Sequence, residues 1–148
     1  MTLVLIDTNV LIYACDTADS LRQERAIQVL RYLEVTGTGR LSVQCLAEFV
    51  NATTRSTRPL YSPPEALAQV ERLARSFVVF DLTPMIVLEA AHGMSDYSLA
   101  YYDAQIWASA RLNQTPLVFS EDFQDEQMLE GVRFVNPFSA NFSLKDWV

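Results

Sequence analysis

The stretch that decides the fold is LVLID at residues 3–7, in which four apolar side chains are followed by a carboxylate. A short apolar run of this kind is typical of a strand buried on both faces of a sheet. Further short strands are predicted within residues 40–43, 77–80, 117–119 and 132–135. The sequence therefore predicts five strands, and the first of them leads directly to an acidic side chain.

Helical patterns fill the segments between these strands. Apolar residues at helical spacing, a serine in a capping position and prolines in first turns mark where the helices begin. Helices are predicted over residues 21–35, 43–55 and 63–76, from 83–84 onward, and over 98–112. The last of them carries Ala100, Ala104 and Ala108. This stripe of small side chains should let a neighbouring element approach closely.

Strands that alternate with helices indicate an α/β fold with three layers, α/β/α, around a mostly parallel five-stranded sheet. No repeat, low-complexity tract or linker divides the chain, so we expect a single domain over residues 1–148. In such folds, sites form outside the carboxyl ends of the strands. Asp7 follows the first predicted strand and Asp122 follows the fourth. Two acidic residues that are far apart in the sequence are therefore expected at one edge of the sheet.

The composition is that of a globular protein, with 50% hydrophobic and 20% charged residues. The apolar runs are too short to span a bilayer, and no basic segment followed by a long apolar stretch marks a signal peptide. Cys15 and Cys45 are the only cysteines, and no cysteine and histidine set has the spacing of a zinc site. We therefore expect a cytoplasmic protein that does not associate with a membrane.

The charge balance argues against a general nucleic-acid binder. The chain has 11 basic and 18 acidic residues, which gives a net charge of −7. Nucleic-acid binders are normally basic, because the neutralisation of phosphates drives their affinity. The objection weakens if several carboxylates lie together and hold metal cations, since the metal then sets the local field.

Asp7 and Glu48 are the first two of four acidic residues in apolar surroundings. Asp7 adjoins a buried strand, where a carboxylate costs free energy unless something compensates it. As an alternative, Asp7 caps a helix, because aspartate is a favoured N-cap residue. Glu48 lies near the middle of a mostly apolar predicted helix, and its alternative is a solvated surface glutamate.

Asp103 and Asp122 complete the set. Asp103 lies in YYDAQIWA at residues 101–108, an otherwise apolar and aromatic helix. Aspartate is a poor residue for a helix interior and is rarely buried without a partner, which favours a functional role there. Asp122 comes just after the fourth predicted strand, and its alternative is an ordinary loop or capping acid.

Together the four acids predict a metal site. Converging carboxylates repel one another, so some would be protonated unless a cation neutralised them. Oxygen ligands without histidine or cysteine suit Mg²⁺ or Mn²⁺ rather than zinc. Such an ion assists phosphodiester cleavage by activating water and by offsetting charge on the phosphoryl oxygens. The sequence leaves open whether one or two ions bind.

These motifs resemble those of PIN domains, and more narrowly those of VapC-like toxins from bacterial type II toxin–antitoxin systems. The resemblance runs through nearly the whole chain and rests on LIDTN at 5–9, Glu48, YDA at 102–104 and SEDF at 120–123. Each motif is short, and their order and spacing make the resemblance specific. It implies a Mg²⁺- or Mn²⁺-dependent endoribonuclease. Its metal-binding and catalytic residues would be Asp7, Glu48, Asp103 and Asp122.

The resemblance also implies supporting residues and partners. Asn9 and Ser120 match polar positions that orient the acids or the attacking water, and Asp125 matches an extra acid of variable spacing. Glu121 competes with Asp125 for that role. The implied partners are an RNA substrate, a second copy of the chain in a homodimer, and a cognate antitoxin whose tail covers the acidic groove.

One departure is that the chain is more acidic than expected for an enzyme that binds RNA. Arg55 and Arg58 are candidates for holding a substrate phosphate or an antitoxin carboxylate, because Arg55 lies two turns beyond Glu48 on the same helix face. The alternative is that both are solvated surface arginines.

Two other functions compete with metal-dependent RNA cleavage. One is a catalytically inactive PIN-like module that binds protein or RNA, which the presence of all four acids argues against. The other is a phosphatase similar to haloacid dehalogenases, which also begin with a strand ending in aspartate. That family requires a second aspartate two residues later, and here the position is Asn9.

Overall fold

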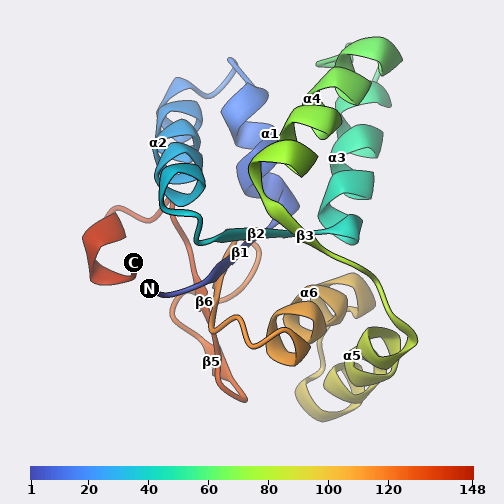
Figure 1. Ribbon diagram of the computed structural model, residues 1–148, viewed down its shortest axis with the longest axis vertical. Helices are drawn as coiled ribbons and strands as arrows, with labels where there is room; N and C mark the ends of the chain where they lie inside the picture. The colour runs from blue at the N-terminus through green and yellow to red at the C-terminus, as the bar shows by residue number, and fades with distance from the viewer.

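A parallel sheet with helices on both faces organises the chain in the computed structural model, which describes residues 1–148 (Figure 1). The strands are β1 (Val4–Ile6), β2 (Gly39–Ser42), β3 (Val78–Phe80), β4 (Leu117–Phe119), β5 (Met128–Leu129) and β6 (Val132–Val135). Their order in the sheet is β3-β2-β1-β4-β6-β5, and every pair is parallel except β5 with β6. The predicted α/β fold is therefore confirmed.

The helices form the outer layers. They are α1 (Thr8–Cys15), α2 (Ser20–Thr36), α3 (Val43–Thr54), α4 (Pro63–Ser76), α5 (Pro84–Tyr97), α6 (Tyr101–Leu112) and a short 3₁₀ helix, η1 (Leu144–Asp146). In Figure 1, α1 to α4 cover one side of the sheet, and α5 and α6 cover the other. No helix is long and apolar enough to cross a membrane.

All five predicted strands are present, and the sheet has one strand more than predicted. The additional strand β5 is only two residues long and forms a hairpin with β6. Glu130 and Gly131 make the turn, both with positive φ, +45° and +83°. A two-residue strand has too few side chains to produce a detectable pattern, which is why the sequence did not indicate it.

The helices differ from prediction in two ways: one helix was not predicted, and another begins later than expected. Helix α1 was not predicted, because it is only eight residues long and contains Thr8, Asn9, Val10 and Ile12, all weak helix formers. Helix α6 begins at Tyr101 rather than near residue 98. Ser98 has φ +55° and ends α5 in the left-handed conformation, so the chain turns before the next helix begins.

The predicted stripe of alanines acts in packing, although only in part. Ala104 and Ala108 are fully buried on α6, whereas Ala100 precedes the helix and is exposed. Helix α5 approaches this face at Gly93, where an added Cβ would lie 2.8 Å from the ring of Trp107. Small residues on both helices therefore let α5 and α6 pack closely on the far side of the sheet.

The register of the central strands places the acidic residues. Ile6 at the end of β1 is level with Phe119 at the end of β4. The next residues, Asp7 and Ser120, therefore emerge side by side at the carboxyl edge. Their backbones stay tied to the sheet, because Asp7 N donates to Phe119 O at 3.0 Å and Ser120 N donates to Val135 O at 3.0 Å.

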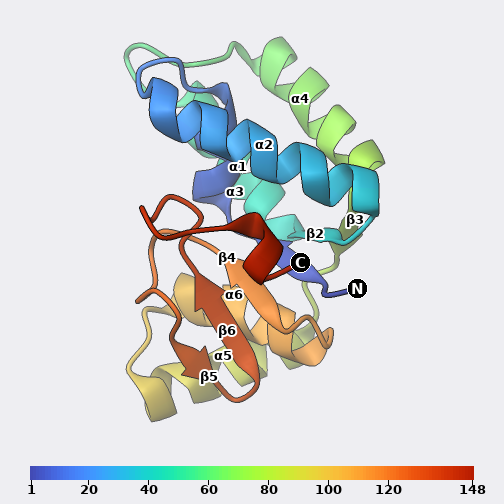
Figure 2. The ribbon, with the colours of Figure 1, turned by 90° about the vertical axis from the view of Figure 1, so that its left-hand side faces the viewer.

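The C-terminal segment closes one side of the molecule. After β6 the chain crosses between α2 and the strands before it reaches η1 (Figure 2). Arg25 on α2 donates to Pro137 O at 2.7 Å, and the rings of Phe119 and Phe142 meet edge to face, 5.6 Å apart. These contacts tie the segment to the carboxyl edge of the sheet.

Candidate functional site

Asp7 lies at the centre of the carboxyl edge, where it is only 5% exposed. It is the N-cap of α1, and its Oδ1 accepts the Thr8 backbone N–H at 2.7 Å. Its Oδ2 accepts the Ser120 hydroxyl at 2.7 Å. Burial raises the pKa of Asp7 to about 6, since these hydrogen bonds only partly offset it and the charges of Asp122 and Glu48 raise it further. Asp7 therefore caps a helix, as the alternative interpretation expected. Its buried position still makes the charged form of the same carboxylate unfavourable.

Asn9 connects Asp7 to Asp122. Its Nδ2 lies 3.1 Å from Asp122 Oδ2, 3.1 Å from Ser120 Oγ and 3.5 Å from Asp7 Oδ2. The Asp122 backbone N–H also donates to Ser120 Oγ at 3.1 Å. Asn9 and Ser120 therefore join both carboxylates in one hydrogen-bonded group.

Glu48 reaches the same edge from α3. Its Oε2 accepts the Thr8 hydroxyl at 3.1 Å, and its Oε1 accepts the Gln44 amide at 2.6 Å. Thr8 thus contacts Asp7 through its backbone and Glu48 through its side chain. Glu48 is half-buried and oriented by two donors, unlike the solvated glutamate that was the alternative.

Asp103 approaches from the other side of the sheet, in the first turn of α6. No hydrogen bond to its carboxylate offsets burial, which raises its pKa, and the nearby charges of Asp122 and Glu48 raise it further. Asp103 therefore lies close enough to Asp122 and Glu48 for their charges to act on it, without a hydrogen bond to either. Their side chains come from the start of α1, from α3, from α6 and from the segment after β4.

No basic side chain balances the charge of the cluster. The ion pairs of the structure involve Arg22 and Arg111, with acidic partners that lie outside the four acids. An uncompensated group of oxygen donors fits a hard divalent cation. No three histidine, cysteine, aspartate or glutamate side chains are arranged to hold an ion directly. Mg²⁺ is usually held by only one or two carboxylates and keeps several waters, so the donor set still fits it.

Two further acids at this edge have other partners. Glu121 accepts hydrogen bonds from the Tyr13 hydroxyl and from Arg22 Nε, the latter at 3.2 Å. Asp125 accepts the Asn136 backbone N–H at 2.8 Å, which ties it to the segment after β6. The structure therefore does not bring either carboxylate into the hydrogen-bonded group around Asp7.

Arg55 and Arg58 form no side-chain hydrogen bond or ion pair with this group. Arg55 ends α3 and Arg58 follows in the loop to α4, and both are exposed. Neither forms an ion pair.

A buried chain of hydrogen-bonded amides, which the sequence did not indicate, lies behind Glu48. The Gln44 amide donates to Glu48 and to the Tyr102 carbonyl at 3.0 Å, while its oxygen accepts the Gln105 amide at 2.8 Å. The Gln105 oxygen accepts the Tyr101 hydroxyl at 2.8 Å. Gln44 precedes Glu48 by one helical turn, and that spacing was the only signal available in the sequence.

Comparisons with known proteins agree with this architecture. Residues 4–127 match the PIN domain family. No curated protein matches the chain.

Three solved structures illustrate the similarity. The DNA-bound VapBC complex from Salmonella typhimurium shares 18% identity and a TM-score of 0.65, over 90% of this chain and 97% of that one. A toxin–antitoxin complex from Klebsiella pneumoniae shares 19% identity and a TM-score of 0.67, with the same coverage. VapC20 from Mycobacterium tuberculosis shares 17% identity and a TM-score of 0.63, over 80% of this chain and 89% of that one.

These structures have the same fold, and the resemblance first seen in four short motifs extends over most of the chain. The family match covers both halves of the acidic edge, from the strand before Asp7 to the segment beyond Asp122. The chain belongs to the PIN domain family.

Proposed function

We propose that the protein is a divalent-metal-dependent endoribonuclease and the toxin of a toxin–antitoxin pair. The observation that carries this proposal is the group of acids at the carboxyl edge. Thr8 contacts Asp7 and Glu48, and Asn9 contacts Asp7 and Asp122. The charges of Asp122 and Glu48 also act on Asp103, and no basic side chain pairs with any of the four acids. The relatives add support. One of the similar structures is described as a toxin that cleaves the sarcin–ricin loop, and others are complexes of VapB with VapC.

Asp7, Glu48, Asp103 and Asp122 would hold Mg²⁺ or Mn²⁺, as one ion or two. When bound, the cation supplies a hydrolytic nucleophile at neutral pH and offsets charge on the phosphoryl oxygens.

The surrounding residues keep the acids in place. Ser120 and Thr8 donate to opposite oxygens of Asp7, which fixes the plane of its carboxylate. Asn9 orients Asp122, and Gln44 orients Glu48. These donors are already arranged before substrate arrives, so little reorganisation is needed during the reaction. Asp125 supports the edge indirectly, through Asn136.

The partners follow from the same proposal. RNA is the substrate, a cognate antitoxin covers the acidic edge, and two copies of the chain form a homodimer in the cytoplasm. Arg55 and Arg58 are exposed and unpaired, so they are open to a phosphate or to an antitoxin carboxylate.

The decisive experiment incubates the purified protein with mixed RNA, with Mg²⁺ or with EDTA. We expect cleavage in Mg²⁺ only. Asp7→Asn should abolish it because the substitution removes charge while keeping volume. Asp96→Asn, the same chemical change at an exposed position of α5, serves as the matched control and should cleave normally. Cleavage that persists in EDTA, or in Asp7→Asn, would refute the proposal.

A further inference from the structure

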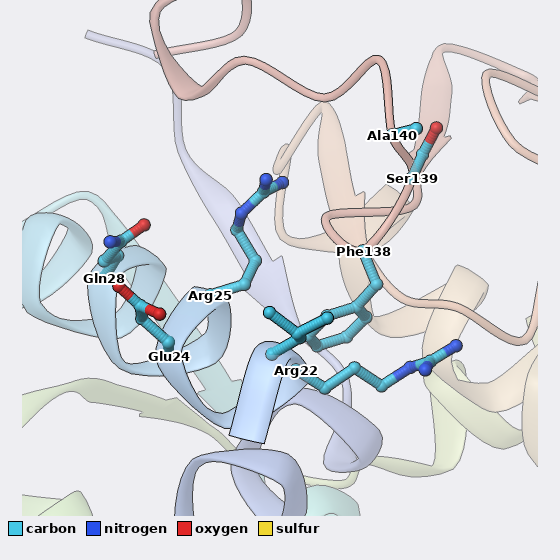
Figure 3. Close-up of a pocket in the computed structure, with 8 residues that line it drawn as sticks. Arg22, Glu24, Arg25, Gln28, Phe138, Ser139 and Ala140 are labelled. Atoms are coloured by element: carbon cyan, nitrogen blue, oxygen red, sulfur yellow. The ribbon is translucent and has the colours of Figure 1, made fainter. Parts of the chain in front are cut away.

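A pocket of about 450 Å³ lies beside the acidic cluster, between α2 and the segment after β6. Arg22, Glu24, Arg25 and Gln28 line it from α2, and residues 138–140 line it from the facing segment (Figure 3). We propose that this pocket binds a backbone phosphate of the RNA strand, on one side of the bond that is cleaved. The proposal rests on the proposed function and assigns a site for substrate outside the metal-binding acids.

Arg25 is the cation that the proposal depends on. One of its N–H groups donates to Pro137 O at 2.7 Å, and its guanidinium lies 5.3 Å from the ring centroid of Phe142. It forms no ion pair with a carboxylate. A guanidinium carries five N–H donors, so most of them stay available after this anchoring. Arg25 is therefore held in one orientation while its charge is uncompensated, which suits recognition of a phosphate.

Arg22 has a different role in the pocket. It pairs with Asp19 at 3.0 Å and with Glu121 at 3.2 Å, so its charge is already balanced. Its guanidinium lies over the ring of Phe138, 5.9 Å from the centroid. Arg22 thus forms the wall between the pocket and the acidic edge, and Arg25 is the phosphate ligand.

A short hydrogen-bonded path joins the pocket to the acids. Arg22 contacts Glu121, whose backbone N–H donates to Asn9 Oδ1 at 3.4 Å. The amide of the same Asn9 contacts Asp122 and Asp7. Only Glu121 and Asn9 therefore separate the pocket wall from two of the proposed metal ligands, so a strand cleaved at the acids can pass over the pocket.

Charge distinguishes this pocket from another at the same edge. Arg22 is already paired, so Arg25 is the cation of the lining that has no partner, and Glu24, the single carboxylate of the lining, forms no ion pair with it. The second pocket lies at the end of β6. Its lining includes Asp125, Glu126 and Asp146 and no basic residue. A phosphate is attracted to the first and repelled from the second, so the RNA strand leaves the acids towards α2.

The experiment measures binding of a short fluorescent single-stranded RNA to the cleavage-defective Asp7→Asn protein by anisotropy. Adding Arg25→Gln should raise Kd roughly tenfold, the effect expected from removing one charge-assisted hydrogen bond to a phosphate. The plot of log association constant against log salt concentration should become less steep by about 0.7, because one phosphate fewer is neutralised on a single strand. Arg75→Gln, the same charge change at an exposed position on α4, should alter both values much less.

Arg25 also anchors the C-terminal segment, so a second variant leaves that anchor intact. Ala140 lines the pocket and is exposed, and Ala140→Asp brings a carboxylate into it without replacing Arg25. Weaker RNA binding in both Arg25→Gln and Ala140→Asp supports the site. Equal losses of affinity in Arg25→Gln and Arg75→Gln would overturn it, as would unchanged affinity in Ala140→Asp. If the wild type does not cleave RNA in Mg²⁺, the proposed function has failed instead.

Discussion

At the scale of single residues, Asp7 carries the largest electrostatic cost. It is buried at the centre of the edge and close to two other carboxylates, which raises its pKa from 3.8 to about 6. The native state therefore binds more protons than the unfolded state between these two values. Stability of the metal-free protein should fall as the pH rises through this window and level off above about pH 6.

The first prediction tests this pH dependence in EDTA. A pKa raised from 3.8 to about 6 corresponds to a loss of roughly 2–2.5 kcal/mol in the free energy of unfolding between pH 4 and pH 7. Asp7→Asn removes the titrating group, so its stability should change by less over the same range. Urea unfolding at several pH values measures both proteins. Parallel pH profiles for the wild type and Asp7→Asn would contradict the prediction.

The second prediction concerns Asp103, which gains nothing from hydrogen bonds to offset its neighbours Asp122 and Glu48. Asp103→Asn removes one repelling charge, so the melting temperature of the metal-free protein should rise by a few degrees. Cleavage should be abolished in the same variant, because the residue is a proposed metal ligand. A lower melting temperature without metal would show that Asp103 is stabilising rather than strained.

At the scale of elements, a chain of amides holds two helices in register across the sheet edge. Glu48 and the Tyr102 carbonyl only accept hydrogen bonds, so Gln44 must present its NH₂ to them and its oxygen to Gln105. Gln105 must then present its oxygen to the Tyr101 hydroxyl. The orientation of both amides is thereby fixed. The first turn of α6, which carries Asp103, is tied to the helix that carries Glu48.

The third prediction is a double-mutant cycle on this chain of amides. Gln44→Leu leaves the buried Gln105 amide without its acceptor and should cost about 1–3 kcal/mol. Gln44→Leu with Gln105→Leu makes both positions apolar and should recover part of that stability. Neither variant should bind Mn²⁺ as tightly as the wild type, because Glu48 no longer has the Gln44 donor. Recovery of Mn²⁺ affinity together with stability would show that the amides serve folding alone.

At the scale of the whole molecule, the proposed metal site accounts for part of the excess of acidic residues. The net charge of −7 includes the four carboxylates of the edge, which a bound cation would neutralise in part. If the pocket at Arg25 binds a substrate phosphate, as we propose, binding of the substrate depends on this local cation rather than on overall charge.

The fourth prediction is that Mn²⁺ raises the melting temperature. A ligand that binds only the native state adds about 2.7 kcal/mol at one hundred times its Kd, or roughly 5–10 °C for a domain of this size. Differential scanning fluorimetry at about pH 7.5, above the raised pKa of Asp7, measures the shift, and Asp7→Asn should show much less of it. The Asp96→Asn control should shift like the wild type. An equal shift in all three proteins would indicate diffuse binding to an acidic surface.

Much of the architecture was predictable because it depends on local patterns. Short apolar runs specified the five parallel strands, and prolines and capping residues specified most helix starts. Helix α1 and strand β5 were missed because a helix of eight residues rich in weak helix formers and a two-residue strand leave almost no periodic signal. Asp7 and Asp122 were singled out because each follows a predicted strand, and Glu48 and Asp103 because each lies in a mostly apolar predicted helix. The resemblance to PIN domains joined the four in one predicted site.

The sequence by itself determined the order of the five parallel strands and of helices α2 to α6, the acids at the strand ends and in the helices, and the excess of negative charge. Tertiary structure alone decided which polar groups meet. Asn9 contacts Ser120 and Asp122 across 111 and 113 residues, and Gln44 contacts Gln105 across 61. The reason is that a sequence pattern shows which face of a helix or strand is buried. A hydrogen bond between distant residues also requires that two such elements pack against each other with those residues aligned. That alignment is set by the packing of the whole chain.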